Sequence, residues 1–249
     1  MEKSLKLLNV TLIAVTSVKI YETIKALTYS MRDIEFGEVV LVTHRKPLGL
    51  PKGITYKHTE KITDIDKFNY LMAYELGSYV NTDYIILVHY DGFIVHPEMW
   101  RNEFLQYDYI GSPWPLPTAK HSTYYDEDGN VCRVGNSVSL RSKRLLEYPK
   151  KAGLEWKPAA DGFYNEDIFL CCMNKVRIEK AGMKFAPIEV ARLFGREHTI
   201  PETEGVTPFL FHKWWGENKD FPRFENPFTK ICLTMKAIRR KLMFWRDWS

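Results

Sequence analysis

The chain has 249 residues, enough for one sizeable hydrophobic core or at most two small ones. Its apolar and charged fractions are ordinary for a globular protein, and no stretch offers the roughly 20 apolar residues that a membrane-spanning helix needs. The net charge of +4 is uneven: the last twenty residues hold six basic side chains and one acidic one, whereas the remainder holds 29 basic and 30 acidic side chains. A nearly neutral body argues against nucleic-acid binding by the whole domain.

The first half of the chain alternates between strand-like and helix-like patterns. Apolar residues recur at helical spacing over residues 20–31 and 68–79. Strands are predicted at residues 10–15, 39–43, 84–88 and, as a short edge strand, 54–57. This order predicts an α/β fold built on a mostly parallel sheet with helices on its faces.

The second half is more irregular. We expect a short helix over residues 98–105, a polar loop that ends near residue 130, a strand at 138–140 followed by a helix, and a long helical segment between residues 164 and 183. No repeat or low-complexity linker interrupts the chain, so one catalytic-sized domain over residues 1–228 is predicted.

The end of the chain, residues 229–249, has the pattern of a separate basic helix. Its apolar residues recur by steps of four and three, and basic residues occupy much of the rest: Ile231, Met235, Ile238, Leu242 and Trp245 form the apolar face. Such a helix can lie in a bilayer interface, and it can equally dock on the domain with its basic side in solvent.

The four cysteines show neither a Cys-x-x-Cys pair nor a histidine partner at zinc spacing. The adjacent Cys171 and Cys172 fit buried, weakly polar positions on a helix. This usage favours a reducing, cytoplasmic compartment.

The most informative stretch is the apolar run that begins at Tyr84 and ends in His89, Asp91 and Gly92. Ligands of open α/β sheets gather outside the carboxyl ends of such strands. Because alternate residues of an extended segment point the same way, His89 and Asp91 could reach one metal ion or one diphosphate. The alternative is a buried strand followed by an ordinary Asp-Gly turn.

One further motif carries groups suited to binding a phosphorylated sugar. There is neither a Gly-x-Gly-x-x-Gly motif after the first strand nor a phosphate loop, but a divalent cation could still neutralise a diphosphate. Gly135 permits a close backbone approach, and the amide of Asn136 can bind sugar hydroxyls. A plain turn that enters a strand is the other interpretation of this pair.

Carboxylates and a histidine complete the candidate chemistry. Glu166 and Asp167 adjoin at a helix start, where they would act either as helix-stabilising charges or as a general base. His212 follows a short apolar strand and precedes Trp214 and Trp215, so it is a candidate metal ligand, although a lone histidine is more often structural. Nucleotide contacts are expected at strand ends and nearby, although each candidate also has a structural interpretation: Thr16, Ser17, Thr43, Asn69 and Tyr90.

Together these blocks resemble the GT-A-fold glycosyltransferases, and in particular a bacterial and viral group assigned only to a domain of unknown function. The resemblance is carried by residues 84–212 and is most specific in the run Asp-Tyr-Ile-Gly-Ser-Pro-Trp at residues 108–114. It also rests on residues 89–93, 135–142, 166–167 and 208–212, and on Phe194 with Glu197.

The resemblance implies a GT-A-like nucleotide-diphospho-sugar fold that binds Mn²⁺ or Mg²⁺. Asp91 would match the last aspartate of the fold's Asp-x-Asp motif, His212 would complete the coordination, and Asp167 would be the base of an inverting enzyme. Gly135 and Asn136 would lie near the donor sugar. His89 stands where the first aspartate is usual, which would weaken the metal site or shift it toward softer ions.

We therefore expect an enzyme that transfers sugar from a nucleotide-diphosphate sugar to a glycan or lipid-linked acceptor, as in polysaccharide biosynthesis. It would be cytoplasmic and would rest on the inner membrane through residues 230–249. The alternatives are a metal-dependent hydrolase or phosphotransferase that uses Asp91, His212 and Glu166, a non-catalytic glycan-binding module, and a membrane adaptor built on the basic tail.

Overall fold

The computed structural model describes residues 4–118 and 123–225, and the predicted tail helix lies outside these ranges. The main sheet has six strands: β1 (Leu5–Val15), β2 (Ile34–Thr43), β3 (Thr55–His58), β4 (Tyr84–Leu87), β5 (Tyr109–Pro113) and β6 (Val134–Ser142). Two very short strands, β7 (Gly195–Arg196) and β8 (Leu210–Phe211), pair in parallel beside it.

Six α-helices connect these strands: α1 (Ile20–Ser30), α2 (Ile65–Tyr70), α3 (Lys143–Lys151), α4 (Glu166–Ile168), α5 (Lys175–Lys180) and α6 (Ile188–Phe194). Helix α2 continues through a π-helical turn and a 3-10 turn as far as Tyr79. Within the described residues no helix is both long and apolar enough to cross a bilayer.

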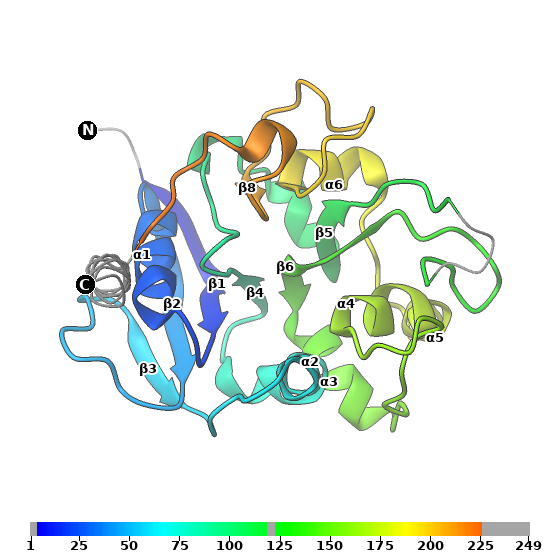
Figure 1. Cartoon of the computed structure of the whole chain (residues 1–249), viewed down its shortest axis with the longest axis horizontal. Helices are drawn as coiled ribbons and strands as arrows, with labels where there is room; N and C mark the ends of the chain where they lie inside the picture. Colours follow the sequence, from blue (N-terminus) through cyan, green and yellow to red (C-terminus); the bar gives the residue numbers. More distant parts are fainter. Residues whose placement is uncertain (1–3, 119–122, 226–249) are drawn as a thin grey trace, which may run out of the picture.

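The sheet order is β3-β2-β1-β4-β6-β5, and only β6 runs antiparallel to its neighbours (Figure 1). The predicted mixed, mostly parallel sheet with flanking helices is therefore confirmed as an α/β architecture. The strand predicted at residues 54–57 is indeed the edge strand β3.

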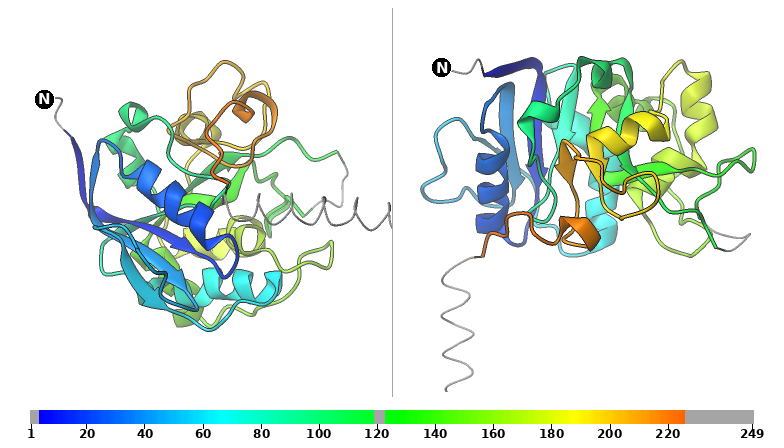
Figure 2. Two further views of the ribbon diagram at one scale, coloured as in Figure 1. Left: turned by 60° about the vertical axis from the view of Figure 1, so that its left-hand side comes forward. Right: turned by 90° about the horizontal axis from the view of Figure 1, so that it is seen from above.

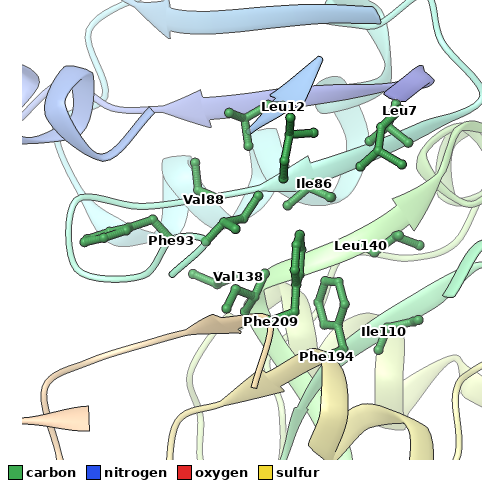
Figure 3. Close-up of a cluster of buried hydrophobic side chains, with 14 of the residues drawn as sticks. Leu7, Leu12, Ile86, Val88, Phe93, Ile110, Val138, Leu140, Phe194 and Phe209 are labelled. Atoms are coloured by element: carbon green, nitrogen blue, oxygen red, sulfur yellow. The ribbon is translucent and has the colours of Figure 1, made fainter. Parts of the chain in front are cut away.

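Alternate side chains of the central strands enter two different cores, which explains their unbroken apolar sequence. Leu12 and Ile86 face the core covered by α1 and α6, and Figure 3 shows this layer reaching Phe194 and Phe209. Ile13 and Leu87 face the opposite core, where residues of the 65–79 helical segment and of α3 pack. Figure 2 shows helices on both faces of the sheet.

The irregular second half differs in detail from the sequence prediction. Residues 98–105 form two 3-10 turns, Pro97–Met99 and Asn102–Gln106, separated by an extended stretch at Trp100 and Arg101. The helical segment between residues 164 and 183 is interrupted at Asn174, whose backbone leaves helical geometry. Helix α6 is not among the elements predicted from the sequence.

The Asp-Tyr-Ile-Gly-Ser-Pro-Trp run is a packing motif. A Cβ atom on Gly135 of β6 would lie 1.9 Å from Cζ2 of Trp114, so this position accepts no side chain while the indole stays in place. Gly111 packs just as closely, since its Cβ would lie 2.3 Å from the carbonyl oxygen of Gly135. Asp108 is buried and accepts hydrogen bonds from the Ser142 hydroxyl and the Lys184 backbone N–H.

Candidate functional site

The chain leaves β4 through a tight turn at residues 89–92, here called the His89 turn. His89 and Gly92 exchange backbone hydrogen bonds, with N–O distances of 2.7 and 3.3 Å. The prediction that His89 and Asp91 share one direction because they alternate along an extended segment is therefore wrong. The Asp-Gly turn is present, and it is the turn that presents both side chains to the site.

Strand β8 brings His212 to the same place. The segment after the His89 turn pairs with β8 through an isolated bridge between Ile94 and Leu210. Farther along, the N–H of Lys213 donates to the carbonyl of Asp91 at 2.7 Å. A contact across more than 100 residues of sequence thus sets His212 beside Asp91.

These three residues form the candidate metal site. One ligand atom from each of His89, Asp91 and His212 lies within 4.8 Å of the other two. Nε2 of His212 lies 3.9 Å from Oδ1 of Asp91, and the two imidazole ring centres are 5.6 Å apart. The predicted convergence of Asp91 and His212 is confirmed.

Gly92 is required by this close packing rather than by an unusual backbone angle. A Cβ atom there would lie 2.7 Å from Cγ2 of Val138 and 2.8 Å from Cδ2 of His212. The absence of a side chain at Gly92 therefore lets β6, β8 and the turn approach one another.

The environment of His89 keeps its imidazole neutral. Burial, followed by the charge on His212, lowers the pKa of His89 to about 4. Its ring packs edge-on against Phe68, and its Nε2 lies 3.4 Å from the Ser137 hydroxyl. A neutral imidazole has a free lone pair for a metal ion at neutral pH.

Glu197, which follows β7, contacts His212 on the side of the imidazole ring away from Asp91. Its Oε1 lies 3.4 Å from Nδ1 of His212, which leaves Nε2 of that ring to face Asp91. Burial opposes the ionisation of Glu197, but contacts with His212 and Lys213 outweigh it and hold the pKa of this carboxyl below its usual value. Such carboxylate–histidine pairs orient metal-binding imidazoles. Glu197 is one of the residues that carry the sequence resemblance, but no role was predicted for it.

Asn136 connects this carboxylate to β6. Its Nδ2 donates to Oε2 of Glu197 at 2.7 Å, and its Oδ1 accepts from the N–H of Val138 at 2.9 Å. The backbone φ of Asn136 is 138°, a strained value for a residue with a side chain. These contacts make Asn136 a positioning residue in the structure, whereas Gly135 packs on Trp114.

A pocket of about 400 Å³ opens beside the three ligands at the carboxyl ends of β1 and β4. Its apolar wall comes from the loop after β1 and from the segment that leads into α2: Val15, Val18, Ile62, Ile65 and Phe68. Its polar lining includes three of the predicted nucleotide contacts and two residues that were not predicted: Thr16, Ser17 and Tyr90, with Thr63 and Asp64. Asp64 is the N-cap of α2, which was a recognisable sequence signal.

The other two predicted nucleotide contacts lie outside this lining. Thr43 is fully buried at the end of β2, and its hydroxyl has no partner among the described residues. Asn69 is buried on α2 and donates to the carbonyl of Tyr164. Both therefore serve the packing around the pocket, because neither side chain reaches its surface.

The adjacent carboxylates of α4 have different environments. Glu166 is buried and accepts a hydrogen bond from Nη2 of Arg141 at 3.0 Å, within a fully buried ion pair. Asp167 makes no ion pair within the described residues. Burial, followed by the charge of Glu166, raises the pKa of Asp167 to about 7. Glu166, predicted as a second catalytic residue, is thus paired with Arg141, whereas Asp167 accepts a hydrogen bond from the N–H of Ile168 at 2.8 Å.

Two imidazoles and one carboxylate suit borderline divalent ions such as Zn²⁺ or Fe²⁺ best, and they suit Mn²⁺ better than Mg²⁺, which prefers oxygen ligands throughout. The neutral state of His89 and the orientation of His212 by Glu197 both fit a bound cation. The residues present therefore fit a metal site whose ligands would be His89, Asp91 and His212.

The chain matches no curated protein. A family model described as "Protein of unknown function (DUF5672)" matches residues 54–212, from the edge of β3 to His212. The matched range contains the three candidate metal ligands, both carboxylates of α4 and Glu197. Since the match covers more than half of the chain, the protein belongs to the DUF5672 family.

Proposed function

We propose that this protein is a GT-A-type glycosyltransferase that uses a nucleotide-diphosphate sugar and a divalent cation. The observation that carries the proposal is the convergence of His89, Asp91 and His212 beside a pocket at the carboxyl ends of parallel strands. The mostly parallel sheet and the sequence resemblance described above support it.

The pocket offers the features that a nucleoside needs. Phe68 and Ile62 give apolar walls for a planar base, while Asp64, Thr16 and Ser17 offer polar groups for base edges and ribose hydroxyls. The Ser17 hydroxyl already accepts from the N–H of Ile62, at 2.9 Å, and its own hydrogen remains available to donate. A nucleoside held here would direct its diphosphate toward Asp91.

When bound, a divalent cation would offset the charge that develops on the departing diphosphate. The chain's own contribution is to hold two imidazoles and one carboxylate in place, with Glu197 beside His212. This donor set leads us to expect a preference for Mn²⁺ over Mg²⁺.

Asp167 is the proposed general base. With a pKa of about 7, it is close to the optimum for accepting a proton at neutral pH, and such assistance is typically worth about 10²–10⁴ in rate. A base opposite the leaving group corresponds to inversion at the anomeric carbon. The acceptor class we propose is a glycan or a lipid-linked saccharide.

A thermal-shift screen of nucleotide sugars, with and without Mn²⁺, tests the proposal. A ligand at about one hundred times its dissociation constant adds about 2.7 kcal/mol of stability. We expect stabilisation by one nucleotide sugar that requires Mn²⁺ and is lost in Asp91→Ala. No stabilisation by any donor in the presence of Mn²⁺ contradicts the proposal.

The matched pair Asp167→Asn and Glu166→Gln then separates the two carboxylates. Asp167→Asn should abolish transfer and leave nucleotide binding nearly intact. Glu166→Gln should instead lower the free energy of unfolding by about 3–5 kcal/mol, because it leaves Arg141 buried and unpaired. Near-normal turnover by Asp167→Asn removes this residue as the base.

A metal-dependent hydrolase is a second candidate, favoured by the ligand set itself. Two histidines and a carboxylate also hold the catalytic zinc of several hydrolases. Release of free sugar or phosphate from the donor at full rate without any acceptor would favour the hydrolase, whereas an absolute acceptor requirement favours transfer.

A further inference from the structure

A second recess lies next to the strand-end pocket, on the α1 side of the molecule. Its volume is about 690 Å³, and it is lined by the start of α1 and by the loop after β2. Ser17 lines both cavities. Figure 1 shows the connection between β2 and β3 projecting from the α1 side of the sheet.

Exposed apolar side chains gather at the rim of this recess. Leu48, in the loop between β2 and β3, is fully exposed. A Cβ atom on the next residue, Gly49, would have no neighbouring atom within 4 Å. Tyr21, in the first turn of α1, is 38 % exposed. Leu48 and Tyr21 both line the recess and stay exposed, which points to a surface that meets something apolar.

Basic groups surround these apolar side chains. Arg45 and Lys46 precede Leu48, both are exposed, and neither pairs with a carboxylate among the described residues. Lys19 lies across the recess with its Nζ 4.1 Å from the ring centre of Tyr90. Glu22 is the single acidic residue among those that line the recess. The charge of the lining is therefore positive.

The described chain ends on the α1 side of the molecule, where the recess also lies. Phe224 packs against Tyr29 of α1 with 5.6 Å between the ring centres. The chain that follows, residues 226–249, carries six basic side chains and one acidic one. The described chain therefore ends beside the helix whose first turn borders the recess.

We propose that the face formed by Leu48 and Tyr21, with Arg45, Lys46 and Lys19, is a contact surface for an anionic phospholipid bilayer. The apolar tip of the loop would enter the interface while the cations meet lipid phosphates. This face and the basic residues 230–249 would bind the bilayer together, because each alone gives only marginal and reversible attachment to a membrane. The contact does not depend on the proposed enzymatic activity, but it would hold the strand-end pocket close to a lipid-linked acceptor.

Co-sedimentation of the full chain with phosphatidylcholine vesicles, with and without phosphatidylglycerol, tests the proposal. We expect binding that needs the anionic lipid and weakens with added salt. The double variant Arg45→Ser/Lys46→Ser should reduce the partition coefficient by up to about 30-fold, since each basic residue near such a surface contributes about 1 kcal/mol. Leu48→Ser should reduce it several-fold without changing its salt dependence.

A matched control removes two exposed lysines from the opposite side of the sheet, at and beyond the end of α3, in Lys150→Ser/Lys157→Ser. This control and Asp91→Ala should bind vesicles like the wild type, which separates the bilayer contact from the proposed catalysis. Wild-type binding by both loop variants overturns the proposal, since the tail would then act alone. Self-association that Leu48→Ser abolishes, without any binding to vesicles, also overturns it by assigning the face to a second copy of the chain.

Discussion

Glu197 shows how a single residue outside the metal ligands can shape the site. One of its carboxylate oxygens contacts His212 and the other contacts Asn136. A single buried carboxylate therefore holds both a candidate metal ligand and the strained residue of β6. The two oxygens have different tasks, and glutamine can reproduce only part of them.

At this scale we predict that Glu197→Gln weakens Mn²⁺ binding by about 10–100-fold, the usual effect of losing a group that orients a ligand. Titration of free Mn²⁺ measures this change. Glu202→Gln is the matched control, because Glu202 is also an ion-paired glutamate but contacts Arg133, at 2.7 Å. Equal Mn²⁺ affinity in the two variants would contradict the role of Glu197.

Asp167 gives a prediction about pH. Because its folded pKa of about 7 is above its ordinary value, kcat/KM should rise with pH through 7 and then level off as the base loses its proton. The sign for stability is opposite. The protonated Asp167 side chain contributes to the free energy of unfolding in full below about pH 4. This contribution is lost as pH rises through 7, because ionisation of the buried group opposes folding.

Thermal unfolding of Asp167→Asn at several pH values checks this sign. Compared with the wild type, the variant should gain relative stability on going from pH 5 to pH 8, because it cannot ionise. A constant difference between the two proteins over this range would mean that Asp167 does not titrate there.

At the scale of elements, the packing of β5 on β6 explains the most specific sequence motif. Gly111, Trp114 and Gly135 let the two strands approach while the indole covers the glycine. The motif is the most specific part of the sequence resemblance, and in the structure it packs β5 against the start of β6, close to Asn136.

We predict that Gly135→Ala lowers the free energy of unfolding by about 1–3 kcal/mol through overpacking against Trp114. Urea denaturation measures this loss. The same substitution in a Trp114→Ala background should cost much less, because the clashing ring is gone. Equal costs in both backgrounds would assign the effect to the backbone of β6 instead.

At the scale of the whole molecule, the metal site joins segments that are distant in the sequence. The His89 turn follows β4 and His212 follows β8, so a bound cation would connect the parallel sheet to the small β7–β8 pair.

Saturating Mn²⁺ should therefore raise the Tm of the wild type by several degrees, since about 2.7 kcal/mol of binding free energy is expected at one hundred times the dissociation constant. His212→Ala should lose this shift, and chelation should reverse it in the wild type. The exposed His58, on the edge strand β3, provides a control, and His58→Ala should keep the full shift. A shift retained by His212→Ala would place the cation elsewhere.

The amino-acid sequence by itself determined the local features of this protein. Unbroken apolar runs specified the buried strands, helical spacing specified α1 and the 65–79 segment, and the abrupt end of β4 marked His89 and Asp91 as site residues. These features depend on neighbours within a few residues, so periodicity and turn chemistry suffice to predict them.

Only the tertiary structure decided which groups act together. The pairing of residues 91–95 with β8 places His212 beside Asp91. Arg141 forms its ion pair with Glu166 and not with Asp167. Glu197 lies next to His212, on the side of the ring away from Asp91. The same folding buries Thr43 and Asn69 away from the pocket. Such outcomes follow from contacts between segments far apart in the chain, whose geometry local sequence patterns do not encode.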